Sequence, residues 1–435
     1  MFSVGLVFIF IAGISFLGFA INALFDKIKI TSILPLIIIG LIIGPVLNLV
    51  NTSSTGLIGE LNPYITAIAV AFVLFEVGIN MRMRTLGKVI LASTKFIILT
   101  QLIIGIAVGA FAYYVMGWPL PLSFIFSFAI SGPSAIAAPT LAKSMKAPES
   151  IKTFISYEGV FSDVLQLVVP LVLLSIYYST SGYAAATAGP TAFTELMGAV
   201  TLGALSAVFW LYILNRFSDA SKNYSWMLTI AMVIATYGMS DYLGLNTALA
   251  VFIFGIVFAN IGSSGKPAEG QEPSFIQKYL SIDEYVEHTR EYQREIVFFV
   301  STFFFVYIGL LFSFQGFTYY VLGAGIVFTA VIILSRIIAM PILSRVFSDE
   351  PEIQKIEKRI AYFNIARGIS PVIIATSILA NVYALQALGS ASTTFTDSFF
   401  VLIIITNIIF AVGVFMSYKP IIEIAPQQKP AKGRN

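Results

Sequence analysis

Residues 120–140 read LPLSFIFSFAISGPSAIAAPT, an apolar stretch that Ser131-Gly132-Pro133-Ser134 interrupts in its middle. About twenty apolar residues in a helix span the ~30 Å hydrocarbon core of a bilayer. Proline removes a backbone hydrogen-bond donor and clashes with the preceding turn, and glycine loosens the helix beside it. We therefore expect a membrane-spanning helix that is broken near its centre. A simple kink is the alternative interpretation, because Pro and Gly are common in membrane helices.

The whole chain has the composition of a membrane protein. Of its 435 residues, 58% are hydrophobic and 11% are charged, whereas a water-soluble domain carries roughly 25% charged residues. Only helices and closed barrels satisfy their backbone polar groups in lipid, and these apolar blocks are too long and too evenly apolar for barrel strands. A polytopic helical protein is predicted and a soluble enzyme is excluded. The absence of cysteine excludes disulfides, thiolate metal sites and a thiol nucleophile.

Thirteen apolar spans follow one another along the chain. The predicted helices are 3–25, 32–50, 63–80, 89–116, 119–145, 150–179, 192–214, 223–240, 246–262, 295–313, 318–345, 359–382 and 395–417. The first begins at Met1 without a basic segment before it, so we interpret it as a helix and not as a signal peptide.

The basic residues indicate the orientation of these spans. Almost all of the 25 Lys and Arg residues lie in odd-numbered loops or in the tail 419–435, and even-numbered loops such as 180–192 and 383–394 contain none. The positive-inside rule places the odd loops and the C-terminus in the cytoplasm, and the N-terminus outside. The ninth loop, about 263–294, is the longest. Its stretch Pro273–Glu295 has the composition of an amphipathic helix, but a solvated connector is the favoured interpretation.

A few charges lie deep within predicted spans. These are the basic residues Arg336 and Arg367 and the acids Glu76, Glu158 and Asp163. Charges in hydrocarbon are costly, so such residues are candidates for function.

A second span is interrupted at Arg367-Gly368-Ile369-Ser370-Pro371. The fifth and twelfth spans correspond to each other if helices 1–6 and 8–13 are two inverted repeats joined by a linker helix. Paired interruptions in inverted repeats point to an ion site near the midplane of a secondary transporter. The exposed helix ends supply partial charges of both signs there.

The sixth span carries Glu158 and Asp163, five residues apart. That spacing is about 140° around a helix and ~7.5 Å along it, so the two carboxylates cannot share a face. Asp163 is on nearly the same face as Gly159 and Gln166. A carboxylate is a hard ligand suited to Na⁺ or Li⁺, and it also binds a proton. We favour Asp163 as the exchange site, and we favour Glu158 as a structural ion-pair partner of an arginine such as Arg336.

The sixth span also resembles that of the cation/proton antiporter superfamily, closest to the NhaP-type sodium/proton antiporters. The family shows Glu, then four residues later Asn followed by Asp. Here these positions are Glu158, Ser162 and Asp163, so the spacing is kept and the Asn is replaced.

Other motifs extend the resemblance over essentially all thirteen spans. The family's Thr-Asp-Pro break corresponds to Ser131-Gly132-Pro133, which keeps the hydroxyl and the proline and lacks the acid. The remaining similar elements are Phe75-Glu76-Val77-Gly78-Ile79 in the third span, Ile333-Leu334-Ser335-Arg336 in the eleventh and Ala366-Arg367-Gly368 in the twelfth.

The resemblance implies a division of the transmembrane domain, residues 1–418. Helices at about 89–179 and 318–417 would form a moving core, and those at about 1–80 and 192–313 a scaffold for a homodimer. The expected partners are a second copy and membrane lipid, and nucleic acid is not one. The Arg of the eleventh helix would pair with Glu158.

These observations predict a cell-membrane antiporter that exchanges one Na⁺ (or Li⁺) for one H⁺ and serves pH homeostasis. Asp163 would bind either ion, with Ser162, Ser131 and Glu158 as further ligands, and no cofactor is expected. Because Ser162 stands where electrogenic relatives have a second acid, electroneutral exchange is favoured. The alternatives are K⁺/H⁺ exchange or symport of an organic anion, for which Arg367 is the spare basic residue. A channel is disfavoured because no Gly-rich filter loop is present.

Overall fold

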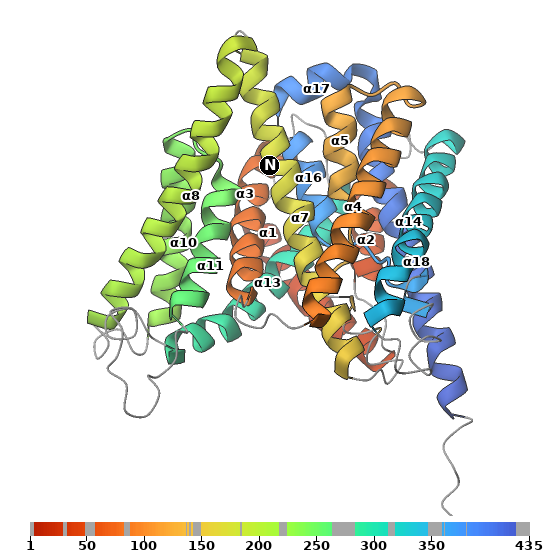
Figure 1. Ribbon diagram of the computed structural model, residues 1–435, viewed down its shortest axis with the longest axis horizontal. Coiled ribbons are helices and arrows are strands. Elements are labelled where there is room, and N and C mark those ends of the chain that lie inside the picture. Colours follow the sequence, from red (N-terminus) through yellow and green to blue (C-terminus); the bar gives the residue numbers. More distant parts are fainter. Residues whose placement is uncertain are drawn as a thin grey trace, which may run out of the picture.

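The computed structural model describes residues 4–28, 33–47, 57–81, 88–135, 137–138, 141, 149–182, 185–216, 224–262, 283–311, 318–346, 359–360, 362–379 and 381–422. Within these ranges all regular structure is helical (Figure 1). The elements are α1 (Val4–Ile28), α2 (Ile33–Leu41), the π-helix η1 (Ile42–Val46), α3 (Leu57–Asn80), α4 (Lys88–Tyr114), α5 (Leu120–Ala129), α7 (Glu149–Gly182), α8 (Ala185–Arg216), α10 (Ser225–Tyr242), α11 (Thr247–Gly262), α13 (Asp283–Leu311), α14 (Tyr319–Val346), α16 (Ser370–Leu379), α17 (Val382–Leu388), the 3₁₀ helix η2 (Gly389–Ala391) and α18 (Ser392–Ile422).

Each of the thirteen predicted spans has a helical counterpart in these ranges, so the prediction of an all-helical membrane protein is confirmed. Six described helices are long and apolar enough to cross a membrane, and several shorter apolar helices accompany them. The loops predicted at 180–192 and 383–394 are shorter than expected, because α7, α8, α17 and α18 extend into them.

The favoured interpretation of the ninth loop as a solvated connector is wrong for its final part. Helix α13 begins at Asp283 and runs without interruption into the span. Its first turns are fastened to α3, because Arg290 Nη2 donates to the carbonyl of Ile79 at 2.9 Å and Gln293 Nε2 donates to that of Phe72 at 2.8 Å. Residues 263–282, the first part of the predicted loop, lie outside the described residues.

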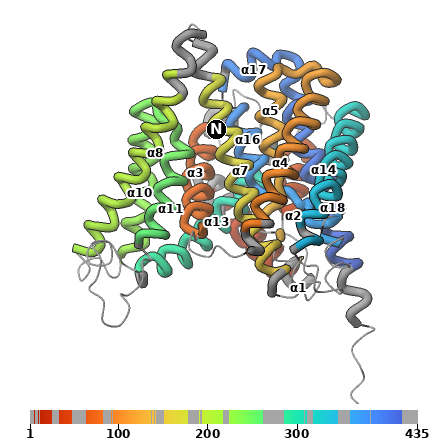
Figure 2. The backbone as a smooth tube through the Cα atoms, viewed as in Figure 1, coloured from red at the N-terminus to blue at the C-terminus, as the bar shows by residue number. Residues whose placement is uncertain are grey.

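The helices pack as two bundles. The α3 bundle comprises α1, α2, α3, α8, α10, α11 and α13, in which α11 packs on α3 and α8, and α13 packs on α2 and α3. The α7 bundle comprises α4, α5, α7, α14, α16, α17 and α18, in which α4 packs on α5 and α14, and α5 packs on α7. Figures 1 and 2 show α8, α10 and α11 at one side and α4, α14 and α18 at the other, with α7 and α16 between them.

Glycines allow very close helix contacts inside each bundle. In the α3 bundle, a Cβ added at Gly309 of α13 would lie 2.2 Å from the carbonyl oxygen of Ile37 in α2. In the α7 bundle, one added at Gly325 of α14 would lie 2.5 Å from Cγ1 of Val401 in α18. Among the described glycines, every such approach joins helices of the same bundle. Small residues let membrane helices pack closely through van der Waals contacts, so each bundle is a tightly packed unit.

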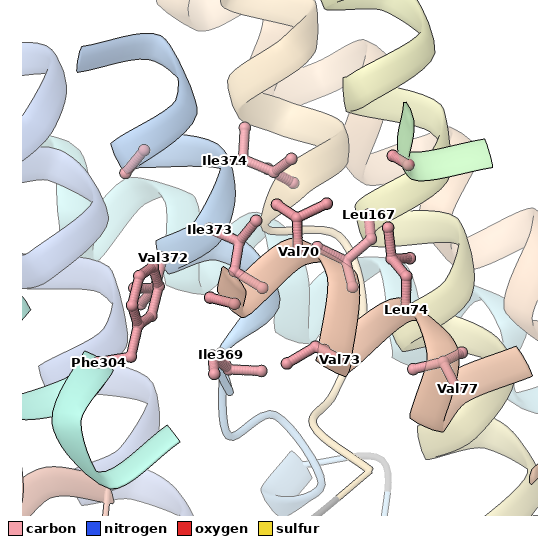
Figure 3. Close-up of a cluster of buried hydrophobic side chains, with 14 of the residues drawn as sticks. Val70, Val73, Leu74, Val77, Leu167, Phe304, Ile369, Val372, Ile373 and Ile374 are labelled. Carbon is pink, nitrogen blue, oxygen red and sulfur yellow. The ribbon is translucent and has the colours of Figure 1, made fainter. Parts of the chain in front are cut away.

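The contact between the bundles is largely apolar where α3 meets α7 and α16 (Figure 3). Its labelled residues from these helices and the segment before α16 are Val70, Val73, Leu74, Val77, Leu167, Ile369, Val372, Ile373 and Ile374. In the C-terminal half of α7, two hydrogen bonds also join the bundles. Ser175 Oγ donates to Glu195 Oε2 at 2.6 Å, and Asn246 Nδ2 donates to the carbonyl of Leu171 at 3.3 Å.

Candidate ion-binding site

The two interrupted spans meet at their breaks. Helix α5 ends at Ala129, the non-helical backbone that follows contains Gly132 and Pro133, and α16 starts at Ser370 after a second non-helical segment. The backbone N–H of Ser134 donates to the carbonyl of Ala366 at 2.9 Å, which ties the two segments together. A Cβ added at Gly368 would lie only 2.4 Å from Ser134 Oγ, so glycine permits this contact.

Proline has a different role in each break. Pro133 lies within the first non-helical segment, where its missing N–H leaves no helical hydrogen bond unmade. Pro371 is the second residue of α16. Proline is favoured in the first turn of a helix, because the N–H groups there have no partner within the helix. Pro371 therefore starts the second half of its span and does not kink it.

Asp163 of α7 lies where these breaks meet. Its Oδ2 accepts the backbone N–H of Ala135 at 2.8 Å. Its Oδ1 accepts the hydroxyl of Ser370 at 2.9 Å and, at a longer 3.5 Å, the amide of Gln166. The residue is 6% exposed. One donor thus comes from each break, and the carboxylate is held in place with lone pairs remaining for a bound ion.

Glu158, on the other side of α7, is paired with Arg336 of α14. The guanidinium makes two contacts with the carboxylate, Nη1 to Oε1 at 2.5 Å and Nη2 to Oε2 at 3.2 Å. Asn364 Nδ2 donates to Oε2 at 2.9 Å. Both charged side chains are almost completely buried, and the guanidinium also lies 5.4 Å from the ring centroid of Phe96. The arginine therefore compensates the charge of Glu158 directly.

Three further residues of the predicted site are two serines and a glycine. Ser162 precedes Asp163 on α7, and Ser131 and Gly132 belong to the first break. Ser162 is 1% exposed, and a Cβ added at Gly132 would lie 2.4 Å from its Cβ. Ser131 is buried in the first break, and its hydroxyl donates to the carbonyl of Phe128 at 2.7 Å. The lone pairs of both hydroxyl oxygens can still accept.

Arg367 is enclosed within the α7 bundle at 1% exposure. Its Nη1 donates to the carbonyl of Ile365 at 3.2 Å, whereas Nε and Nη2 have no hydrogen-bond partner among the described residues. Its own carbonyl accepts the amide of Asn407 at 2.9 Å. It lies within electrostatic reach of Asp163, Glu158 and Arg336, so these four charges form one cluster.

Several residues of this region had no assigned role in the sequence analysis. Ser370 stood in the second break and Gln166 on the face of Asp163, but their contacts with the carboxylate depend on how the spans pack. Nothing in the sequence pattern singled out Asn364. Asp397, near the start of the last predicted span, is also buried, and Glu76 of α3 lies within electrostatic reach of Asp163 and Arg294.

The site combines one carboxylate, hydroxyl oxygens and non-helical backbone, and its side chains are buried. Hard oxygen ligands of this kind bind alkali cations, and the same carboxylate binds a proton. The compensated pair of Glu158 and Arg336 adds no net charge.

Comparison with known proteins supports a transporter. A model of the family described as sodium/hydrogen exchanger, transmembrane, matches residues 8–419. The chain is 24% identical over 162 residues to the Na⁺/H⁺ antiporter NhaH of Halobacillus dabanensis, a match covering 36% of this chain and 40% of that protein. It is 26% identical over 166 residues to the Na⁺/H⁺ antiporter NhaP of Pseudomonas aeruginosa, covering 37% and 39%. The matched part thus spans about two fifths of the length of these relatives.

The fold is similar to that of a solved antiporter. The sodium proton antiporter MjNhaP1 from Methanocaldococcus jannaschii matches with a TM-score of 0.71 at 18% identity, over 94% of this chain and 97% of that one. This likeness confirms the predicted fold class. The relatives are antiporters, in agreement with the prediction of a transporter and not an enzyme. Because the family model matches residues 8–419, this protein belongs to the transmembrane sodium/hydrogen exchanger family.

Proposed function

We propose that the protein is a secondary active transporter that exchanges Na⁺ or Li⁺ for H⁺ across the cell membrane. The observation that carries this proposal is the position of Asp163, a buried carboxylate held by one donor from each of two crossing helix breaks. In secondary transporters, ion sites form where interrupted helices expose their backbone ends near the midplane. The antiporter relatives support the same function.

Exchange follows from competition at this carboxylate. A cation bound by Asp163, Ser162 and the backbone of the first break must leave before a proton can take its place, and the reverse also holds. Neither ion can be carried while the other occupies the site, so the two fluxes are coupled.

The charge balance of the site favours one cation for one proton. Ser162 precedes Asp163 where a second acid would stand, Gly132 brings no carboxylate, and Glu158 is paired with Arg336. The site then has one carboxylate, Asp163, whose charge is compensated by an exchangeable ion. The cation-bound and the proton-bound states therefore carry the same net charge across the membrane.

The two bundles provide a basis for alternating access. The α7 bundle, which holds Asp163, would move as a unit past the α3 bundle, and the apolar contact in Figure 3 offers few directional bonds to break.

The α3 bundle would form the dimerisation scaffold of a homodimer, which multi-angle light scattering of the detergent-solubilised protein can test. The excess of basic residues in odd-numbered loops supports an outside N-terminus and a cytoplasmic C-terminus.

The decisive experiment compares the wild-type protein with Asp163→Asn in proteoliposomes with the membrane potential clamped. Adding Na⁺ or Li⁺ should collapse a preset pH gradient with the wild type and leave it intact with the variant. Asp241→Asn, at an exposed acid near the end of α10, is the matched control and should behave as the wild type. Cation-dependent proton flux in Asp163→Asn would overturn the assignment.

K⁺/H⁺ exchange is the second candidate. Ser162 and Gly132 stand where the related antiporter motifs have an asparagine and an aspartate. A site with fewer charged ligands has a smaller preference for Na⁺ over the larger K⁺. A K⁺ arm of the same experiment separates the two. An organic-anion site would require Arg367 to be open to a cavity, whereas Arg367 is 1% exposed, so the structure disfavours it.

A further inference from the structure

The backbone at Gly132 is surrounded by side chains on the side where a Cβ would lie. That Cβ would be 2.4 Å from the Cβ of Ser162, an atom fixed by its own backbone, so no side chain fits at position 132 without displacing α7. The amide nitrogens of Gln166 and Gln101 lie 2.9 and 3.0 Å from the same point. Two side-chain amides therefore occupy the space beside the first break.

Gln166 is the one of these amides that also contacts Asp163. It follows Asp163 by three residues on α7, and its Nε2 lies 3.5 Å from Asp163 Oδ1. The side chain is 1% exposed, and Oε1 has no hydrogen-bond partner among the described residues. Leaving a buried amide oxygen without a partner costs free energy, and such atoms in native proteins call for an explanation.

We propose that Gln166 is a ligand of the transported cation and binds it through Oε1. This inference rests on the proposed function and names a residue of the same site. An amide oxygen is a hard, neutral ligand for an alkali cation. Oε1 of Gln166 would add an oxygen ligand beside the carboxylate of Asp163 without adding charge. This ligand would be next to position 132, where the close packing leaves no room for an acidic side chain.

The side chain of Gln166 can contribute to the site both without a bound cation and with one. Without a cation, the Nε2 group of Gln166 faces Oδ1 of Asp163 as a hydrogen-bond donor. When a cation binds to Oδ1 of Asp163 instead, the terminal amide of Gln166 rotates, so that its acceptor Oε1 takes the place of its donor Nε2. Gln101 of α4 also comes within 3.0 Å of a Cβ at position 132 through its Nε2, but in the described structure no hydrogen bond joins it to Asp163.

The test is binding of radioactive Na⁺ to the purified protein in detergent at alkaline pH, together with the KM for Na⁺ in proteoliposomes. Gln166→Leu should weaken Na⁺ binding about tenfold or more, as expected for loss of one ligand worth roughly 1.4 kcal/mol. Gln101→Leu removes an amide from the same space and is the matched control, with binding close to that of the wild type. Gln166→Glu keeps an oxygen at the same distance and should retain binding.

Two results would overturn the inference: Na⁺ binding by Gln166→Leu at wild-type affinity, or equal losses in Gln166→Leu and Gln101→Leu, which would show a general effect of polarity. Gln166→Met is the second apolar variant, to be used if Gln166→Leu is not monodisperse. Failure of the proposed function is distinguishable, because the wild type itself would then show no proton flux driven by Na⁺ or Li⁺.

Discussion

The two carboxylates of α7 differ in what compensates their charge. Glu158 faces the guanidinium of Arg336 and the amide of Asn364, whereas the direct partners of Asp163 in the described structure are neutral donors. A carboxylate held by neutral donors can exchange its counter-ion, because no fixed cation is bonded to it. Arg367 lies within electrostatic reach of Asp163 but makes no hydrogen bond with it in the described structure. This difference supports the proposal that exchange takes place at Asp163 and that Glu158 has a structural role.

The first residue-scale prediction concerns this ion pair. Glu158→Gln and Arg336→Gln should each lower the free energy of unfolding by about 3–5 kcal/mol, because each leaves the other charge buried and unpaired. The double variant should lose clearly less than the two single losses together, since it leaves neither charge behind. Thermal and denaturant unfolding in detergent measures all three, and additive losses would show that the two residues are not coupled.

The second residue-scale prediction concerns pH. If Na⁺ and H⁺ compete for Asp163, the apparent KM for Na⁺ should rise about tenfold for each unit that the pH falls below the pKa of the carboxyl group, by mass action. The maximal rate at saturating Na⁺ should stay unchanged on the side where the two ions compete. Initial rates over a matrix of pH and Na⁺ concentrations check this. A falling maximal rate at constant KM would place the proton at another group.

At the scale of elements, the crossing of the two breaks depends on close backbone contact. The hydrogen bond from Ser134 to Ala366 and the glycine at 368 bring the two non-helical segments together. Asn407 of α18 donates to the carbonyl of Arg367 at 2.9 Å, which supports the second segment from behind. The position of Ser370 against Asp163 follows from these contacts, because Ser370 is the first residue of α16.

Gly368→Ala tests this crossing. The added Cβ would lie 2.4 Å from Ser134 Oγ and 2.9 Å from Ser134 Cβ, so we expect a loss of about 1–3 kcal/mol from overpacking, together with impaired exchange. Adding Ser134→Gly removes both contacting atoms and should restore stability and transport. Gly323→Ala in α14, where a Cβ would meet nothing within 4 Å, is the control and should be neutral. Normal stability in Gly368→Ala alone would mean that the segments are not in close contact.

At the scale of the whole molecule, the close glycine contacts and the apolar contact have different roles. The glycines fasten helices within a bundle, and the apolar residues of α3, α7 and α16 meet between bundles (Figure 3). Packed units change their relative position more readily across an apolar contact than across a network of hydrogen bonds, because fewer directional bonds are exchanged. The hydrogen bonds of Glu195 and Asn246 between the bundles involve the C-terminal half of α7, away from this apolar contact.

Cross-linking tests this division, and the absence of cysteine from the chain removes any background. Val73→Cys on α3 with Ile373→Cys on α16, joined by a cleavable bifunctional thiol reagent, should stop exchange until the link is cleaved. Gly325→Cys with Val401→Cys is the control within the α7 bundle. A Cβ added at Gly325 would lie 3.6 Å from Val401 Cβ, within the range of a disulfide, and this link should leave exchange intact. Full activity of the Val73–Ile373 link would argue against movement between the bundles.

The sequence by itself determined the class of protein, its spans, both interruptions and the few charges placed in hydrocarbon. These features are local, since apolar block length, proline chemistry and the cost of a buried charge are read over one or two turns. The geometry of the site was decided by the tertiary structure alone. Asp163 receives its donors from residues 28 and 207 positions away. The sequence favoured Arg336, 178 positions away, as the partner of Glu158, but the two contacts of its guanidinium and the hydrogen bond from Asn364 were not predicted. No periodicity extends over such separations, so the donors from Ala135 and Ser370, and the lack of a partner for Gln166 Oε1 among the described residues, follow only from the packing of the helices.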